Sequence, residues 1–266
     1  MSAPAPDILV LCGSPHEGGA SEKAAGAFAA ALGERGADTT LWRLSEHPVA
    51  ACRNCGGCAA GGECVIADAW HVLSRHMDAC DALLLVSPVY FAGPPAHLKA
   101  ALDRCQSYWM RKYRLHVPPP SARPARLVVL GEGGDPFGTA PLEAVCTSAL
   151  NCANLRIDGR VECFVGRGAA PGSSELAAIA DALLADAART RAPSEGASPE
   201  EASLEGALPA ASIREGAGQA QPAHGGAVAG GGTSVRGNAP AGDGALADSP
   251  DNAASAAPLS DGMGAA

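Results

Sequence analysis

The chain has little basic charge, no long apolar run and no recognisable export signal. Of its 266 residues, 19 are Lys or Arg and 28 are Asp or Glu, which gives a formal net charge of −9. An acidic protein has no electrostatic reason to bind nucleic acid or an anionic membrane, so we expect neither as a partner. No apolar stretch approaches the length of a membrane span, and residues 1–7 lack the basic region of a signal peptide. We therefore expect a cytoplasmic protein.

A second absence divides the chain into two parts. From about Arg191 onward the sequence contains no Cys, Lys, Phe, Tyr or Trp and consists mainly of Ala, Gly, Pro and Ser. Such a composition buries too little apolar surface to offset the entropy that is lost on ordering. We therefore predict one globular domain over residues 1–190, which is long enough for a well-buried core, and a disordered tail over residues 191–266.

Cysteine, in contrast, is abundant, and four of the ten cysteines lie in one short loop. The loop has the spacing C-x2-C-x2-C-x5-C, with thiols at Cys52, Cys55, Cys58 and Cys64. Three interpretations are open: a 4Fe–4S cluster, which takes four thiolates, a structural zinc ion, or a thiol-rich loop without metal. In a reducing compartment these thiols would be available for such chemistry. We expect the other six to be small buried apolar residues, namely Cys12, Cys80, Cys105, Cys146, Cys152 and Cys163.

Apolar runs alternate with helical patterns along the first 190 residues. Five strands are predicted, at residues 7–12, 39–44, 81–87, 126–130 and 157–165. Five helices are predicted, at residues 21–35, 68–80, 94–106, 139–155 and 173–189. The segment 107–123, rich in Tyr, Trp and Pro, is expected to be irregular. Strands that alternate with helices predict an α/β fold in which helices cover both faces of a parallel sheet.

Three loops that follow predicted strands suggest a ligand site. The loop Gly13–Ser21 leads from a strand into a helix and offers backbone N–H groups, hydroxyls and the positive end of the helix dipole to a phosphate. It lacks the lysine of the Walker pattern and the second glycine of the dinucleotide pattern. Ligands of open α/β sheets lie beyond the carboxyl ends of the strands. A phosphate on this loop and a flat ring against Ser87–Pro95 and Gly131–Gly134 would accommodate a flavin mononucleotide. Alternatively, the first loop only connects a strand to a helix.

Three sequence segments carry a family resemblance. They are Gly-Ser-Pro-His-x-x-Gly-x-Ser from Gly13, Cys-x-x-Cys-Gly-Gly-Cys-x5-Cys-Val-Ile-x-Asp from Cys52, and Ser-Pro-Val-Tyr-Phe-x-Gly with its continuation from Ser87 to Arg104. Together they resemble the NAD(P)H-dependent FMN reductase-like family, and more narrowly its iron–sulfur flavoprotein branch, over about residues 7–188. The resemblance implies a flavodoxin-like three-layer fold, a five-stranded parallel sheet in the order 2-1-3-4-5, noncovalent FMN, and assembly as a homodimer or homotetramer.

The resemblance also implies site residues. The FMN phosphate would be held by Ser14, His16, Gly19, Ala20 and Ser21, with His16 where the family often has arginine. The ring would be lined by Pro88, Val89, Tyr90, Phe91 and Gly93, and closed on its third side by Gly133 and Gly134. A 4Fe–4S cluster would be held by Cys52, Cys55, Cys58 and Cys64.

The implied activity is that of an FMN-dependent oxidoreductase. Electrons would pass from NAD(P)H through FMN to a small-molecule acceptor such as a quinone or a flavin, and no catalytic acid or base is nominated because the cofactor carries this chemistry. One alternative is an electron-transfer module in which a 4Fe–4S cluster is fed by a ferredoxin-like donor. Another is a non-enzymatic flavin- or zinc-binding scaffold whose tail recruits partners.

Overall fold

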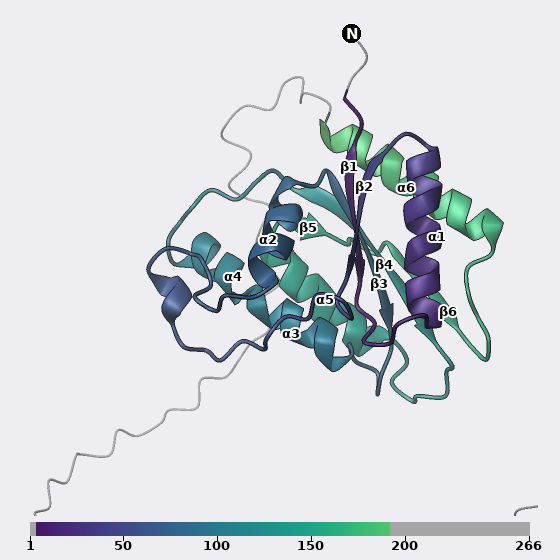
Figure 1. The fold of residues 1–266 in the computed structure, drawn as a ribbon, viewed down its shortest axis with the longest axis horizontal. Coiled ribbons are helices and arrows are strands. Elements are labelled where there is room, and N and C mark those ends of the chain that lie inside the picture. The colour runs from purple at the N-terminus through teal and green to yellow at the C-terminus, as the bar shows by residue number, and fades with distance from the viewer. Residues whose placement is uncertain (1–3, 192–266) are drawn as a thin grey trace, which may run out of the picture. The chain divides into compact units, whose positions relative to one another are not determined.

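The computed structural model describes residues 4–191, so the predicted disordered tail, apart from Arg191, lies outside the described residues. The described strands are β1 (Asp7–Cys12), β2 (Asp38–Arg43), β3 (Ala82–Pro88), β4 (Arg123–Gly131), β5 (Leu155–Arg156) and β6 (Val161–Val165). The described helices are α1 (Ala20–Glu34), the 3-10 helix η1 (Gly57–Ala59), α2 (Trp70–Ala79), α3 (Ala96–Arg104), α4 (Gln106–Tyr113), α5 (Ala140–Cys152) and α6 (Ser173–Arg191). Figure 1 shows how they surround one central sheet.

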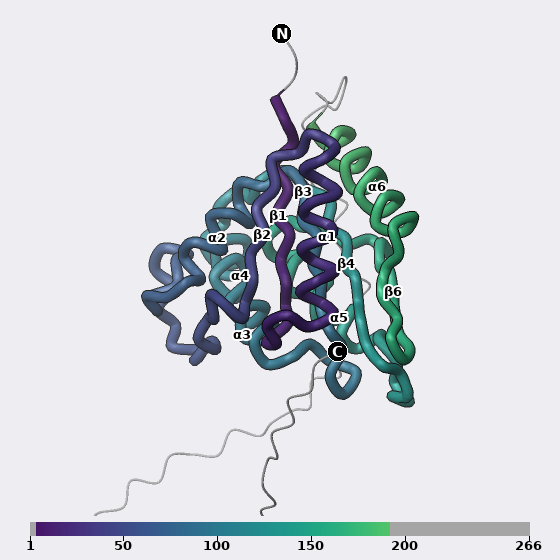
Figure 2. Tube along the Cα trace, turned by 45° about the vertical axis from the view of Figure 1, so that its right-hand side comes forward, coloured from purple at the N-terminus to yellow at the C-terminus, as the bar shows by residue number. Residues whose placement is uncertain are grey.

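The sheet is parallel throughout and has the order β2-β1-β3-β4-β5, with β6 also paired to β4. This order confirms the predicted α/β fold with strand order 2-1-3-4-5. In Figure 2, α1 and α6 lie on one side of the strands, while α2, α3 and α4 lie on the other. Because the strands are parallel, the loops that follow β1, β3 and β4 emerge at the same edge of the sheet.

Alternating side chains of the central strands build a core on each face. On β1, Ile8 and Val10 pack toward α1 and α6, whereas Leu9 and Leu11 pack toward the helices on the other face. All four are at most 2% exposed. A sheet covered on both faces needs strands that are apolar at every position, which is why the continuous apolar runs predicted the central strands.

The predicted fifth strand, 157–165, was wrong in its first four residues, because only Val161–Val165 forms a strand and a separate short strand, Leu155–Arg156, precedes the turn. Asp158 and Gly159 both have positive φ, 46° and 75°, and the Arg160 N–H donates to the Ile157 carbonyl at 2.9 Å. This turn separates β5 from β6, and both remain paired to β4. An Asp-Gly pair is a turn signal, so the break was readable from the sequence.

The segment 107–123 is not wholly irregular, because Gln106–Tyr113 forms helix α4. The Tyr108 side chain is buried and donates a hydrogen bond to the Ser74 carbonyl of α2 at 2.9 Å. This tertiary contact, which local pattern does not reveal, stabilises the helix. The remaining predicted helices are present with ends shifted by a few residues.

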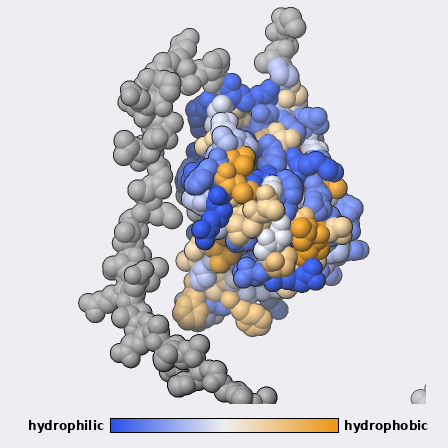
Figure 3. All heavy atoms as spheres, turned by 90° about the vertical axis from the view of Figure 1, so that its left-hand side faces the viewer, coloured by the Kyte–Doolittle hydropathy of each residue, from blue (hydrophilic) through white to orange (hydrophobic). Residues whose placement is uncertain are grey.

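None of the helices within residues 4–191 is long and apolar enough to cross a bilayer. Figure 3 shows the side of the molecule that lies at the left in Figure 1, where apolar patches are small and separated by polar surface.

Candidate functional site

A cavity of about 570 Å³ opens at the carboxyl ends of β3, β4 and β6. Its walls come from the segment Pro88–Ala92, the segment Leu130–Pro136, Gly138, Thr139 and Val165. The structure therefore brings together six of the residues assigned to the flavin ring: Pro88, Val89, Tyr90, Phe91, Gly133 and Gly134. A cavity of this size at this edge of a parallel sheet is typical of a small-molecule or cofactor site.

A tight turn presents the aromatic wall of the cavity. Tyr90 and Gly93 exchange two backbone hydrogen bonds of 2.9 and 3.0 Å, so Gly93 closes the turn and does not itself line the cavity. The two central residues, Phe91 and Ala92, have positive φ of 50° and 58°, a strained conformation for an aromatic residue. The Phe91 side chain is 99% exposed and the Tyr90 side chain 46%. The turn thus holds two aromatic rings at the surface beside the cavity.

The opposite wall is formed by glycines whose backbone conformation or spacing excludes a side chain. Gly133 and Gly134 have φ of 86° and 87°, which favours glycine. Gly131 lies beside Val89 at the ends of the adjacent strands β4 and β3, and a Cβ at Gly131 would lie 2.6 Å from Cγ1 of Val89, so a side chain is excluded there. The cavity thus has aromatic side chains on the turn that follows β3 and bare backbone on the loop that follows β4.

The loop predicted to hold a phosphate lies at the neighbouring strand end. The Gly13 N–H donates to the Val86 carbonyl at 2.8 Å, which fixes the start of the loop beside β3. Ser14 is buried, and its Oγ accepts from the His16 N–H at 3.1 Å. Gly19 is the N-cap of α1 and supplies no side-chain cap, which leaves the first turn suited to an anion. The five assigned phosphate residues belong to this loop and its helix start.

One carboxylate already occupies part of this loop. Glu22, in the first turn of α1, accepts a hydrogen bond from the Gly18 N–H at 2.5 Å and pairs with Arg43 at 2.8 Å. Sequence analysis did not single out this residue. The glutamate stands at the third helical position, as in a capping box, but it accepts from the residue before the N-cap Gly19 and not from the N-cap itself. A phosphate bound to this loop would lie near the negative charge of the Glu22 carboxylate.

The four loop cysteines come together. Cys52, Cys55, Cys58 and Cys64 all line one small cavity of about 20 Å³ and form no disulfide. Burial raises the pKa of the Cys58 thiol, and negative charge on Cys64, Cys52 and Cys55 would raise it further. Among residues 4–191, no three His, Cys, Asp or Glu side chains are arranged to hold one metal ion. An iron–sulfur cluster takes four thiolates, so the donor chemistry of the loop fits that group.

Two arginines that sequence analysis did not single out brace this cysteine loop. Arg104, at the end of α3, is 1% exposed and forms a bidentate pair with Asp68, with distances of 2.8 and 3.0 Å. Burial alone would raise the pKa of Asp68, but hydrogen bonds from Arg104 and from two backbone N–H groups lower it below 3.8. Arg111 on α4 donates to the Gly62 carbonyl at 3.0 Å and pairs with Glu63.

The expectation of six buried cysteines was correct for four and wrong for Cys163, which is exposed, while Cys152 is half-buried. Cys163 lies on β6, which within residues 4–191 pairs only with β4 and so forms an edge of the sheet. Its thiol is 3.6 Å from Oγ1 of Thr139, which donates to Glu143 at 2.6 Å. Of these three residues only Thr139 lines the 570 Å³ cavity, where its hydroxyl is a further polar part of the wall.

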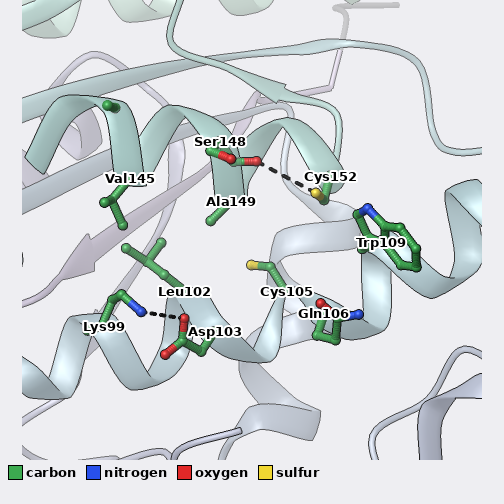
Figure 4. A pocket seen from close by; sticks show the side chains of 11 residues that line it. Lys99, Leu102, Asp103, Cys105, Gln106, Trp109, Val145, Ser148, Ala149 and Cys152 are labelled. Carbon is green, nitrogen blue, oxygen red and sulfur yellow. Dashed lines mark hydrogen bonds and ion pairs between the residues drawn. The ribbon is translucent and has the colours of Figure 1, made fainter. Parts of the chain in front are cut away.

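A second cavity, of about 500 Å³, lies between α3, α4 and α5 (Figure 4). A Lys99–Asp103 ion pair of 2.6 Å lies on its α3 side, and Cys152 donates to the Ser148 carbonyl at 3.6 Å on its α5 side. Its lining contains none of the residues assigned to phosphate, ring or metal. The cavity at the strand ends is therefore the candidate cofactor site.

The sequence is similar to one known protein family and to curated relatives. Residues 6–132 match the family model described as NADPH-dependent FMN reductase. An iron–sulfur flavoprotein of Methanosarcina thermophila is 38% identical over 97 residues, which cover 36% of this chain and 51% of that protein. One from Archaeoglobus fulgidus is 34% identical over 101 residues, covering 38% and 46%. The chain thus spans about half the length of these curated relatives.

Solved structures with a similar fold have low sequence identity to this chain. An apo NADH:FMN oxidoreductase has a TM-score of 0.45 at 16% identity and covers 71% of this chain and 91% of its own. An oxidised flavodoxin from Bacillus cereus has a TM-score of 0.42 at 11% identity, covering 69% and 97%. Residues 6–132 of the chain thus match the NADPH-dependent FMN reductase family, the sheet has the strand order of a flavodoxin-like fold, and the chain has distant homology to the archaeal iron–sulfur flavoproteins.

Proposed function

We propose that this domain binds FMN and uses it to transfer electrons from NADH or NADPH to a small acceptor such as a quinone or another flavin. The observation that carries the proposal is the 570 Å³ cavity at the strand ends, with an aromatic turn on one wall and glycines on the other. The loop Gly13–Ser21 lies at the neighbouring strand end and would hold the phosphate. The match of residues 6–132 to an FMN reductase family supports the same assignment.

Within this proposal the chain's own groups bind and orient the cofactor. Bound FMN would supply the redox chemistry, because it accepts hydride and releases electrons. Tyr90 and Phe91 would cover the ring, and the absence of a side chain at Gly131, Gly133 and Gly134 would leave room for it. The Thr139 hydroxyl, whose proton is engaged by Glu143, would present an acceptor oxygen to the cavity.

The test is reconstitution followed by reduction. The full chain is incubated with FMN, freed of unbound flavin, and titrated anaerobically with NADH and NADPH while flavin absorbance is recorded. We expect about one FMN per chain and loss of the oxidised flavin spectrum with at least one of the two nucleotides. A protein that remains colourless after soaking in FMN would contradict the flavin site. A flavin that neither nucleotide bleaches would contradict the reductase assignment alone.

A second function is favoured by the cysteine loop. Four thiols line one cavity, and two arginines fix the loop around them. Similarity to two proteins that are named iron–sulfur flavoproteins, over 97 and 101 residues, supports the same function. We propose that the loop holds a 4Fe–4S cluster that exchanges single electrons with the flavin, fed by a ferredoxin-like donor, in a homodimer or homotetramer. Anaerobic reconstitution should give about four irons and four sulfides per chain, and their absence would remove this second function.

A further inference from the structure

Arg104 is a buried cation at the base of the cysteine loop. One terminal nitrogen donates to the Ala50 carbonyl at 2.9 Å and the other to the Ile66 carbonyl at 3.2 Å. Ala50 precedes the first loop cysteine and Ile66 follows the last. A single guanidinium therefore ties both ends of the loop together, and Asp68 holds that guanidinium in place through two further hydrogen bonds.

The fifth N–H of the same side chain has no partner. The Nε atom of Arg104 is fully buried and makes no hydrogen bond within residues 4–191. Arg104 also lines the 20 Å³ cavity, together with Cys52, Cys55, Cys58 and Cys64. Buried polar groups are nearly always hydrogen-bonded, and an unpaired one calls for an explanation. The Nε atoms of Arg43, Arg123 and Arg126 are also buried without a hydrogen bond in the described part of the chain, but of these four arginines only Arg104 lines the four-thiol cavity, where an anionic sulfur ligand would give it a partner.

We propose that Arg104 is the positioning residue of an iron–sulfur cluster in this loop: it fixes both ends of the loop and directs positive charge and its free N–H at the cluster. The inference rests on the second function proposed above. A cluster bound by thiolates carries net negative charge and gains more upon reduction. A cation or a hydrogen bond near its sulfurs therefore favours the reduced state and raises the reduction potential.

Arg111 provides a matched control because it braces the same loop differently. It contacts the tip of the loop, at the Gly62 carbonyl and Glu63, and also Asp78 on α2 at 3.2 Å. It does not belong to the lining of the four-thiol cavity. Loss of Arg111 should therefore loosen the loop without changing the charge that a cluster experiences at short range.

The experiment compares the full-length chain with Arg104→Gln, Arg104→Lys and Arg111→Gln after anaerobic reconstitution with iron, sulfide and FMN. Bound FMN per chain reports folding, iron and sulfide per chain report cluster content, and spectroelectrochemistry reports the cluster potential. We expect R104Q to lose more than half of its iron and to show a more negative potential. R104K should keep a potential close to that of the wild type but still lose iron, since lysine restores charge and not the two-ended tie. R111Q should keep the wild-type potential.

The outcomes separate the two proposals. If the wild-type chain binds FMN but takes up no iron, both the cluster and the role of Arg104 are overturned. If the wild type binds both FMN and a cluster, and R104Q has the same iron content and the same cluster reduction potential, the role of Arg104 alone is overturned. If R104Q binds no FMN, its iron content cannot be interpreted and R104K becomes the test. An iron content of R104K equal to that of the wild type would show that the tie between the loop ends does not matter, and would overturn the inference.

Discussion

At the scale of single residues, the candidate site combines backbone strain with exposed aromatic surface. Phe91 is the clearest case, since its φ is 50° and its side chain is 99% exposed. Folding alone gives no reason for a phenylalanine there, because a left-handed conformation costs a residue with a Cβ about 1–2 kcal/mol and no burial compensates for it. Such outliers gather where function requires them.

We therefore expect Phe91→Asn to stabilise the protein while weakening FMN binding. Asparagine tolerates this backbone region, so the free energy of unfolding should rise by about 1 kcal/mol, and loss of the ring should weaken flavin affinity. Urea unfolding and flavin titration measure the two effects. Phe137→Asn is the control, because Phe137 is also exposed, at 73%, but has no positive φ. A stability gain equal in both variants would contradict the strain explanation.

Gly131→Ala should weaken flavin binding with little loss of fold. The added Cβ would lie 2.6 Å from Val89, so one wall of the cavity must move. Overpacking of this kind costs about 1–3 kcal/mol, and we expect roughly a tenfold or greater rise in the Kd for FMN. Gly33→Ala, in α1, is the control because nothing lies within 4 Å of its added Cβ. Unchanged FMN affinity in Gly131→Ala would argue against a ring between these walls.

At the scale of elements, sequence periodicity predicted most of the fold and part of the site. Continuous apolar runs identified β1 and β3, and glycine-rich loops after strands identified two walls of the cavity. The Asp158–Gly159 turn was a local signal that was overlooked. Helix α4 was missed because the hydrogen bond from Tyr108 to Ser74 and the ion pairs of Arg111 come from distant elements. Arg104 was missed for the same reason, since its partners lie 36 to 54 residues away.

The Asp68–Arg104 pair links the start of α2 to the end of α3, and its contribution should depend on pH. Asp68→Asn leaves a nearly fully buried arginine without its anion, which should cost about 3 kcal/mol near pH 7. The pKa of Asp68 is lower in the folded state than its ordinary value of 3.8. The pair therefore contributes its full stability above about pH 4 and loses it as the pH falls through the depressed pKa.

Urea unfolding of wild type and Asp68→Asn between pH 7 and pH 3 measures this dependence. The difference in unfolding free energy should stay constant down to about pH 4 and then narrow. Asp103→Asn, which breaks an exposed pair with Lys99, is the control and should cost no more than about 1 kcal/mol. If the difference in unfolding free energy between the wild type and Asp68→Asn does not change with pH, the lowered pKa of Asp68 is contradicted.

At the scale of the whole molecule, the described part of the chain contains everything that the proposed function uses. Both apolar cores, the cavity at the strand ends and the cysteine loop all lie within residues 4–191. A single domain of this size can bury enough surface to be stable by itself. The fold class was predictable from the sequence because alternating strands and helices admit few arrangements. The assignment of individual residues to FMN or to a cluster stays a prediction.

Removal of residues 192–266 should therefore leave flavin binding unchanged. We expect the truncated chain to bind FMN with the same Kd and to unfold in one cooperative transition, as measured by flavin fluorescence and by circular dichroism. The full-length chain under identical conditions is the control. A truncated protein that no longer retains the flavin would mean that the domain boundary lies beyond residue 191.

Helix α3 sets the spacing of the two proposed redox groups. It starts directly after the aromatic turn, with Pro95 as its N-cap, and ends at Arg104, which lines the cavity of the four thiols. Nine helical residues span roughly 13 Å at 1.5 Å of rise per residue. The proposed flavin and cluster sites would then adjoin the two ends of one short rigid helix, so that a change in the length of α3 would move one site relative to the other.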